Sequence, residues 1–293
     1  MGRDGPAKPF PVRSALTAVA FVVVVQLASL VFTYFIAPVT VSAGYPYAPG
    51  GASAAGSATS AITLVAGAFV TTVVAVWLIK RKRENVFTWI ILIATSLVLF
   101  LMTLLATSTV AAYFLDPDSA LALSVLLSVV VTVIFAMVTR QPKLQSVAPV
   151  ITGLLSAEVG SIFASTIPVL TVLLLAGVFS IYDIYAVFRG PLRQLVTIAP
   201  TRALTAVTSK VGEFTLGTGD TIFYSMLPAL GFIQGMTSSS GAGFNIPLAL
   251  ATMVAIDAGV VVTLLLLSRS KMLPGLPIPM ALGLGTLLLL MVL

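Results

Sequence analysis

The sequence predicts an all-α polytopic membrane protein, and three observations support this fold class. Of the 293 residues, 59% are hydrophobic and only 8% are charged, whereas a soluble domain carries about 25% charged residues. Apolar runs of about 20 residues, long enough to cross a bilayer as helices, recur along the whole chain. The lysines and arginines lie in short clusters between these runs, as expected of the loops of a membrane protein.

Apolar runs between charged or turn-rich breaks define nine predicted transmembrane helices. They lie, in order, at 14–37, 60–79, 86–106, 119–138, 145–163, 167–188, 217–235, 247–267 and 277–293. The first run is not a signal peptide, because its apolar core is too long and no small-residue cleavage site follows it. We expect one membrane domain over 1–293, with six helices in 14–188, a cytoplasmic connection at 189–213 and three helices in 217–293. The connection at 38–59 is rich in Gly, Ala, Ser and Pro, and we assign it no regular structure.

The basic residues orient the nine helices. If the chain crosses the membrane nine times, all fifteen fall on one side, and the connection between the third and fourth helices carries Asp116 and Asp118 instead. The positive-inside rule then predicts a cytoplasmic N-terminus and an exoplasmic C-terminus. The fifteen are Arg3, Lys8, Arg13, Lys80, Arg81, Lys82, Arg83, Arg140, Lys143, Arg189, Arg193, Arg202, Lys210, Arg269 and Lys271.

The composition also excludes several kinds of chemistry. The chain has no cysteine and no histidine, so it has no disulfide, no Cys/His metal site, no thiol nucleophile and no Ser-His machinery. The net charge of +6 is spread over loops and forms no basic face with interleaved aromatic residues, so we expect no nucleic-acid partner. We expect neither a metal nor a cofactor.

Four acidic residues fall within the predicted helices: Glu158, Asp183, Asp220 and Asp257. A carboxylate inside a membrane helix costs about 2.5–3.5 kcal/mol on insertion scales, so each is a functional candidate. Asp183 and Asp220 lie six and seven residues from the nearest inner charge, about 9 and 10 Å along consecutive helices. Asp257 lies deeper, where a structural bond to a neighbouring helix is favoured over proton handling. Glu158 is expected near the outer interface with access to water.

Two neighbouring carboxylates at one depth can share a proton, because both cannot ionise cheaply. The ionised member can take a proton from an attacking water, and the protonated member can polarise a peptide carbonyl and then protonate the leaving amine. The same pair could instead serve a proton- or cation-coupled transporter. From the carboxylates alone, transport is the favoured interpretation.

Three motifs surround these carboxylates: SIYDIYAVFRGPLRQLV at 180–196, LGTGDTIFYS at 216–225 and KMLPGLPIPM at 271–280. Together with their order and the nine-helix topology, they resemble the presenilin family of intramembrane GxGD aspartyl proteases. The resemblance implies that Asp183 and Asp220 are catalytic and that substrates are transmembrane segments of other proteins. It implies a substrate path lined by Leu216, Gly217, Thr218, Gly219, Pro274, Gly275 and Leu276.

The sequence departs from that family in two places. Gly275 stands where the family usually has alanine, and a literal Pro-Ala-Leu at 228–230 lies inside the seventh helix, where we interpret it as a kink. The connection at 189–213 is short, whereas animal presenilins are cut within a long loop there, so self-cleavage is not expected. The short connection also suggests a microbial relative that acts alone in a cell membrane.

The residues flanking the two aspartates have physical roles of their own. Gly217 and Gly219 lack a Cβ, so a substrate backbone could approach closely, although small residues also serve close helix packing. The prolines at 274, 277 and 279 should leave the carbonyls of 273–276 without helical partners. Protein groups, water or an extended substrate must then satisfy them, and the last of these would be strand addition. We expect transmembrane peptides and lipid as partners. A homo-oligomer is compatible with the sequence, and nothing in it requires accessory subunits.

Overall fold

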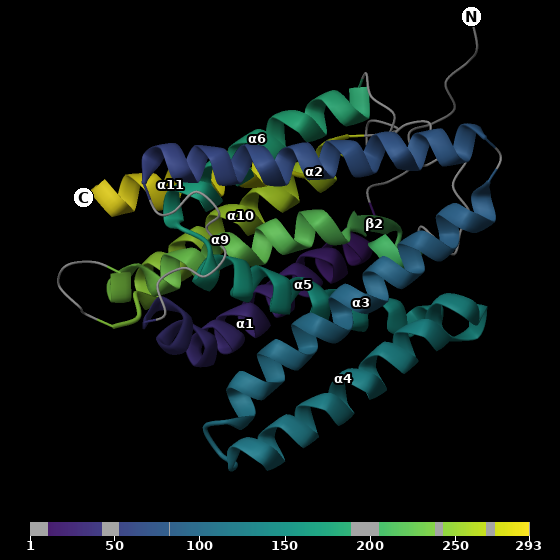
Figure 1. The fold of residues 1–293 in the computed structure, drawn as a ribbon. Helices are drawn as coiled ribbons and strands as arrows, with labels where there is room; N and C mark the ends of the chain where they lie inside the picture. Colours follow the sequence, from purple (N-terminus) through teal and green to yellow (C-terminus); the bar gives the residue numbers. More distant parts are fainter. Residues whose placement is uncertain are drawn as a thin grey trace, which may run out of the picture.

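The structure, a computed structural model, describes residues 11–42, 53–81, 83–188, 205–237, 243–267 and 273–292. The described chain is almost entirely helical (Figure 1). Its elements are α1 (Val12–Ser42), α2 (Ala54–Lys80), α3 (Glu84–Ala111), α4 (Pro117–Arg140), the 3₁₀ helix η1 (Pro142–Val147), α5 (Ala148–Thr166), α6 (Val169–Phe188), β1 (Thr208–Val211), β2 (Phe214–Gly217), α9 (Thr218–Thr237), α10 (Ile246–Leu267) and α11 (Pro277–Val292).

A helix occupies each of the nine predicted segments. Among the described residues, seven helical stretches are long and apolar enough to cross a membrane: Val12–Val41, Ala54–Leu78, Asn85–Ala111, Pro117–Arg140, Lys143–Thr166, Val169–Phe188 and Ile246–Leu267. The α11 helix is apolar but has only 16 residues, and α9 is not among the seven. The chain is therefore a polytopic membrane protein, while nine crossings and the orientation stay predictions.

Parts of the predicted connections are regular structure. Within 38–59, α1 continues through Pro38 to Ser42 and α2 begins at Ala54. No regular structure was predicted for this connection, and at both of its ends that prediction is wrong. Residues 43–52, most of the 189–213 connection and the basic residues at 3, 8, 82, 189, 193, 202, 269 and 271 lie outside the described residues.

A two-stranded antiparallel hairpin, β1–β2, leads into α9 and was not predicted. Its register pairs Thr208 with Gly217 and Val211 with Phe214. Gly212 lies in the turn with a φ of 62°, a backbone conformation that glycine adopts at no steric cost. Burial alternates along both strands, as period-two side-chain geometry requires when one face of a hairpin is covered. The hairpin thus ends three residues before Asp220.

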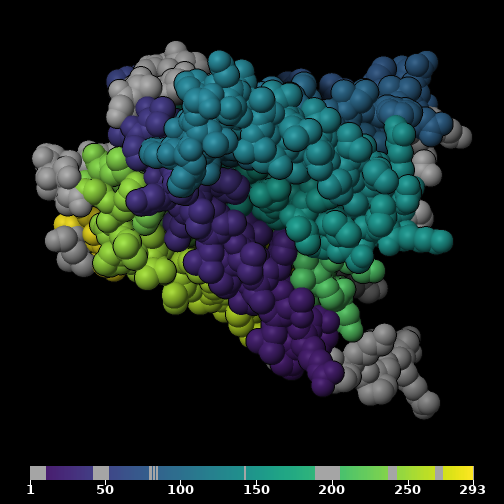
Figure 2. Space-filling model, turned by 90° about the horizontal axis from the view of Figure 1, so that it is seen from below, coloured from purple at the N-terminus to yellow at the C-terminus, as the bar shows by residue number. Residues whose placement is uncertain are grey.

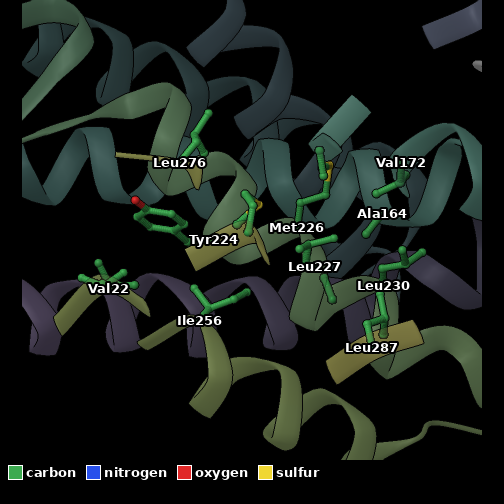
Figure 3. Packing of buried hydrophobic residues seen from close by; sticks show 14 of the residues in the cluster. Val22, Ala164, Val172, Tyr224, Met226, Leu227, Leu230, Ile256, Leu276 and Leu287 are labelled. Carbon is green, nitrogen blue, oxygen red and sulfur yellow. The ribbon is translucent and has the colours of Figure 1, made fainter. Parts of the chain in front are cut away.

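The core lies around α9, which packs on α1, α5 and α10. Figure 3 shows Tyr224, Met226, Leu227 and Leu230 of α9 among apolar side chains of other helices, including Ile256 of α10. On the outside, Figure 2 shows purple α1 crossing one face between teal α4 and yellow-green α10. Many large apolar side chains of the outer helices are exposed, as lipid-facing surfaces require.

Candidate functional site

Asp183 lies on α6 and is partly buried. Its Oδ2 atom accepts a hydrogen bond of 3.0 Å from the backbone N–H of Leu276, which comes just before α11. This bond joins positions 93 residues apart in the chain. The carboxylate on α6 is therefore held against the segment that precedes the last helix.

Asp220 lies in the first turn of α9 and is also partly buried. It is close enough to Asp183 for the two carboxylates to interact electrostatically. Glycines enclose it on two sides: a Cβ added at Gly275 would lie 2.5 Å from Asp220 Oδ2, and one added at Gly217 would lie 3.1 Å from the same atom. An alanine at position 275 would therefore require a different placement of this carboxylate.

The peptide unit between Gly275 and Leu276 connects the two aspartates. Its N–H binds Asp183, and the Cα of Gly275 lies beside Asp220. Tyr224, one turn after Asp220 on α9, donates its hydroxyl to the carbonyl of Gly275 at 2.8 Å. The carbonyl of Leu276 accepts the N–H of Met280 within the first turn of α11. The carbonyl of Gly275 is therefore satisfied by the protein, which is one of the expected outcomes. The carbonyl of Leu276 is paired within the helix, so the expectation that the prolines leave it unpaired is wrong.

The remaining residues of the proposed substrate path line the same region. Leu216 and Thr218 are buried on either side of the strand end at Gly217, while Pro274 and Leu276 are buried on the α11 side. Gly219 is exposed, and a Cβ built on it meets nothing within 4 Å. The structure thus brings Asp183, Asp220 and the seven path residues into one neighbourhood.

Hydroxyl side chains fix the beginning of α9 against α5. Ser156 of α5 shares a hydrogen bond of 2.7 Å with Thr221, the residue after Asp220. Ser225 donates to the carbonyl of Ser156 at 3.0 Å, and Thr152 bonds Ser209 of β1 at 2.5 Å. Buried hydroxyls commonly join helices in this way where no water competes. No role for these hydroxyl residues or for Tyr224 was predicted from the sequence. Only the spacing of Tyr224, four residues after Asp220, indicates that it lies on the same face of the helix as the aspartate.

The other two carboxylates lie elsewhere. Glu158 on α5 is 1% exposed, and its Oε2 accepts a hydrogen bond of 2.9 Å from Thr103 of α3. The expectation that water reaches Glu158 is therefore wrong, because α3 covers this part of α5. Asp257 on α10 is partly buried beside the amide of Gln26 on α1. Within the described residues, no three acidic side chains gather in a way that could hold a metal ion.

Comparison with known proteins gives structural likeness only. No family model and no curated protein matches the sequence. A presenilin-family intramembrane aspartate protease solved in space group C222 superposes with a TM-score of 0.62 and 20% identity, covering 92% of this chain and 97% of that one. The structure in space group P2 gives 0.61 and 21%, covering 95% and 96%. Over nearly its whole length, this chain therefore has the fold of the presenilin-family intramembrane aspartate proteases.

Proposed function

We propose that this chain is an intramembrane aspartyl protease that hydrolyses peptide bonds within transmembrane segments. The observation that carries the proposal is the Gly275–Leu276 peptide unit, which contacts Asp183 and lies against Asp220 at once. Two carboxylates around one backbone segment form a site for a peptide bond and a water molecule. The fold shared with solved intramembrane aspartate proteases supports the same function.

In the proposed mechanism, Asp183 and Asp220 share one proton. The ionised carboxylate removes a proton from water as the oxygen attacks the scissile carbonyl carbon. The protonated carboxyl donates a hydrogen bond to the carbonyl oxygen, which gains negative charge as the tetrahedral intermediate forms. A proton then passes to the departing amine nitrogen, the C–N bond breaks, and the pair again holds a single proton.

A substrate helix must be unwound first, because its carbonyls are tied in its own hydrogen bonds. In the proposal, Leu216, Gly217, Thr218 and Gly219 line one side of the unwound segment. Pro274, Gly275 and Leu276 line the other. Because β2 leads directly into the turn that carries Asp220, a strand laid along β2 would bring its backbone to the level of that carboxylate. This arrangement supports extended peptides cut from transmembrane helices as substrates.

The test uses the purified full chain with a generic transmembrane peptide, in detergent and in lipid vesicles, and detects products by mass spectrometry. We expect cleavage that a transition-state mimic of aspartyl proteolysis blocks. We expect no cleavage after Asp183→Asn or Asp220→Asn, and substantial cleavage after Asp257→Asn, the matched intramembrane control. If the peptide stays intact in both environments, the protease proposal fails. Ion-dependent uptake by proteoliposomes would instead support a proton- or cation-coupled transporter, which the shared fold does not favour.

A further inference from the structure

A groove of about 410 Å³ runs between α3 and α4, and neither Asp183 nor Asp220 lines it. Figure 1 shows these helices side by side at the edge of the bundle. On α3 the lining runs from Trp89 to Phe100, which is about 16 Å of helix, and on α4 from Thr132 to Arg140, about 12 Å. The lining residues recur every three or four positions, so each helix presents one face. The volume falls in the range of about 300–1,000 Å³ that small-molecule sites occupy.

One end of this groove is cationic. The guanidinium of Arg140 lies 5.3 Å from the centre of the Trp89 ring, within the distance of about 6 Å at which a cation is attracted to an aromatic face. Arg81 and Arg83 precede α3, and Lys143 follows α4, so they lie at the same end of the helix pair. Within the described part of the chain, none of these four cations forms an ion pair with a carboxylate.

The rest of the groove is open and largely apolar. Ile93 is 61% exposed and Leu97 is 54% exposed, although both are large aliphatic side chains. Aliphatic walls below a cation and an indole ring match the order of groups in a phospholipid, whose acyl chains lie below a phosphate. Tryptophan is also enriched at the depth of lipid headgroups.

We propose that the α3–α4 groove binds one anionic phospholipid. The phosphate accepts charge-assisted hydrogen bonds from Arg140, and one acyl chain lies along the groove from Trp89 toward Phe100. A second copy of this chain fits the groove less well. Inserted in the same orientation, it would bring its own basic end to the level of Arg140, where like charges repel.

The two tryptophans of the chain provide a matched pair for testing this site. Trp77 is 53% exposed and Trp89 is 54% exposed. Arg81 lies 5.4 Å from the Trp77 ring, nearly the distance between Arg140 and Trp89. Only Trp89 of the two lines the groove. Trp77 therefore reports how lipid quenches an exposed indole that has a neighbouring arginine but lies outside this groove.

The experiment measures tryptophan quenching by lipids with brominated acyl chains. The full chain is placed in phosphatidylcholine nanodiscs with increasing mole fractions of brominated phosphatidylglycerol. Trp77→Phe leaves Trp89 as the single reporter, and Trp89→Phe leaves Trp77. We expect half-maximal quenching of Trp89 at a mole fraction about fivefold lower than for Trp77. Both indoles have a neighbouring arginine, so the difference comes from the groove, and a factor of about five corresponds to burying roughly one acyl CH₂ group.

Three further variants separate charge from shape. Arg140→Gln should return Trp89 to the concentration dependence of Trp77, whereas Arg13→Gln, which removes an exposed cation of α1, should not. Ala136→Phe fills the groove and keeps Arg140, so it should also abolish the preference. Equal quenching of Trp89 by brominated phosphatidylcholine would overturn the proposal, since the site would then take any lipid. If neither lipid quenches Trp89, the proposal is also overturned, because a second copy of this chain would then cover the groove.

Discussion

The packing of α10 against α11 makes Gly259→Ala the sharpest test of how the site is held. A Cβ at Gly259 would lie 2.5 Å from the Cα and 2.8 Å from the N of Pro279. Ordinary contacts begin at 3.4 Å, so the start of α11 must move by about 0.9 Å. Backbone atoms cannot rotate away as a side chain can, and overpacking of this kind costs about 1–3 kcal/mol.

The displacement should reach the aspartates. Pro279 lies three residues after Leu276, whose N–H binds Asp183, and the helical bond from Met280 to Leu276 couples the two. Because a misplacement of about 1 Å can cost about 100-fold in rate, we expect kcat/KM for peptide cleavage to fall by about that factor. Thermal unfolding in detergent should show the lower stability independently of activity.

Gly285→Ala is the matched control on α11, because a Cβ built on Gly285 meets nothing within 4 Å. We expect wild-type activity and an unchanged or slightly higher Tm, since alanine favours the helix over glycine by up to about 1 kcal/mol. If Gly259→Ala behaves like Gly285→Ala in both assays, α10 and α11 can separate without cost. The reasoning that ties their packing to the site would then be refuted.

Three other changes test separate parts of the structure. Gly275→Ala places a methyl group 2.5 Å from Asp220 Oδ2, so kcat/KM should fall at least about tenfold. Gly177→Ala on α6, whose added Cβ meets nothing within 4 Å, should cleave normally. Ser156→Ala removes the hydroxyl bond between α5 and α9. The free energy of unfolding should fall by about 0.6 kcal/mol, as for interhelical hydrogen bonds in other membrane proteins. Thermal unfolding measures this loss, with Ser156→Thr as the variant that keeps the hydroxyl. Asp116 caps α4, and its hydrogen bond from the backbone N–H of Ser119 lowers its pKa below the ordinary value of 3.8. The cap should therefore stabilise α4 above pH 3.8 and be lost as the pH falls through the lowered pKa, which faster amide exchange in the first turn of α4 would show. Asp116→Ala should remove this pH dependence.

The helices were predictable because their signal is local. A run of about 20 apolar residues has few stable alternatives to a helix in a membrane, since every backbone group must be satisfied within the segment. This is why a helix occurs in each of the nine predicted segments. The ends were less predictable. The α1 helix runs past Pro38 to Ser42, where the hydroxyl of Thr40 donates to the carbonyls of Ile36 and Ala37, whereas a proline and a following Gly/Ser-rich stretch suggest a helix end.

The hairpin was missed for a different reason. Residues 208–217 do alternate, with a glycine at the turn, but strands of four residues carry a weak pattern. Ser209, Val211, Phe214 and Leu216 are buried because α1 and α5 cover one face of the hairpin. Which side of the hairpin is buried thus depends on helices that lie far away in the sequence.

The sequence alone determined that the chain lies in a membrane and which segments form its helices. It also placed two aspartates at a similar depth, each within a recognisable motif. Hydropathy, charge and motif spacing are properties of short segments, so they could be read without a fold. Only the tertiary structure decided which groups surround those aspartates. The contacts of Asp183 with Leu276, of Tyr224 with Gly275 and of Glu158 with Thr103 join distant segments. Such contacts depend on how the helices pack, because the depth of a residue along its own helix leaves open which neighbour it faces.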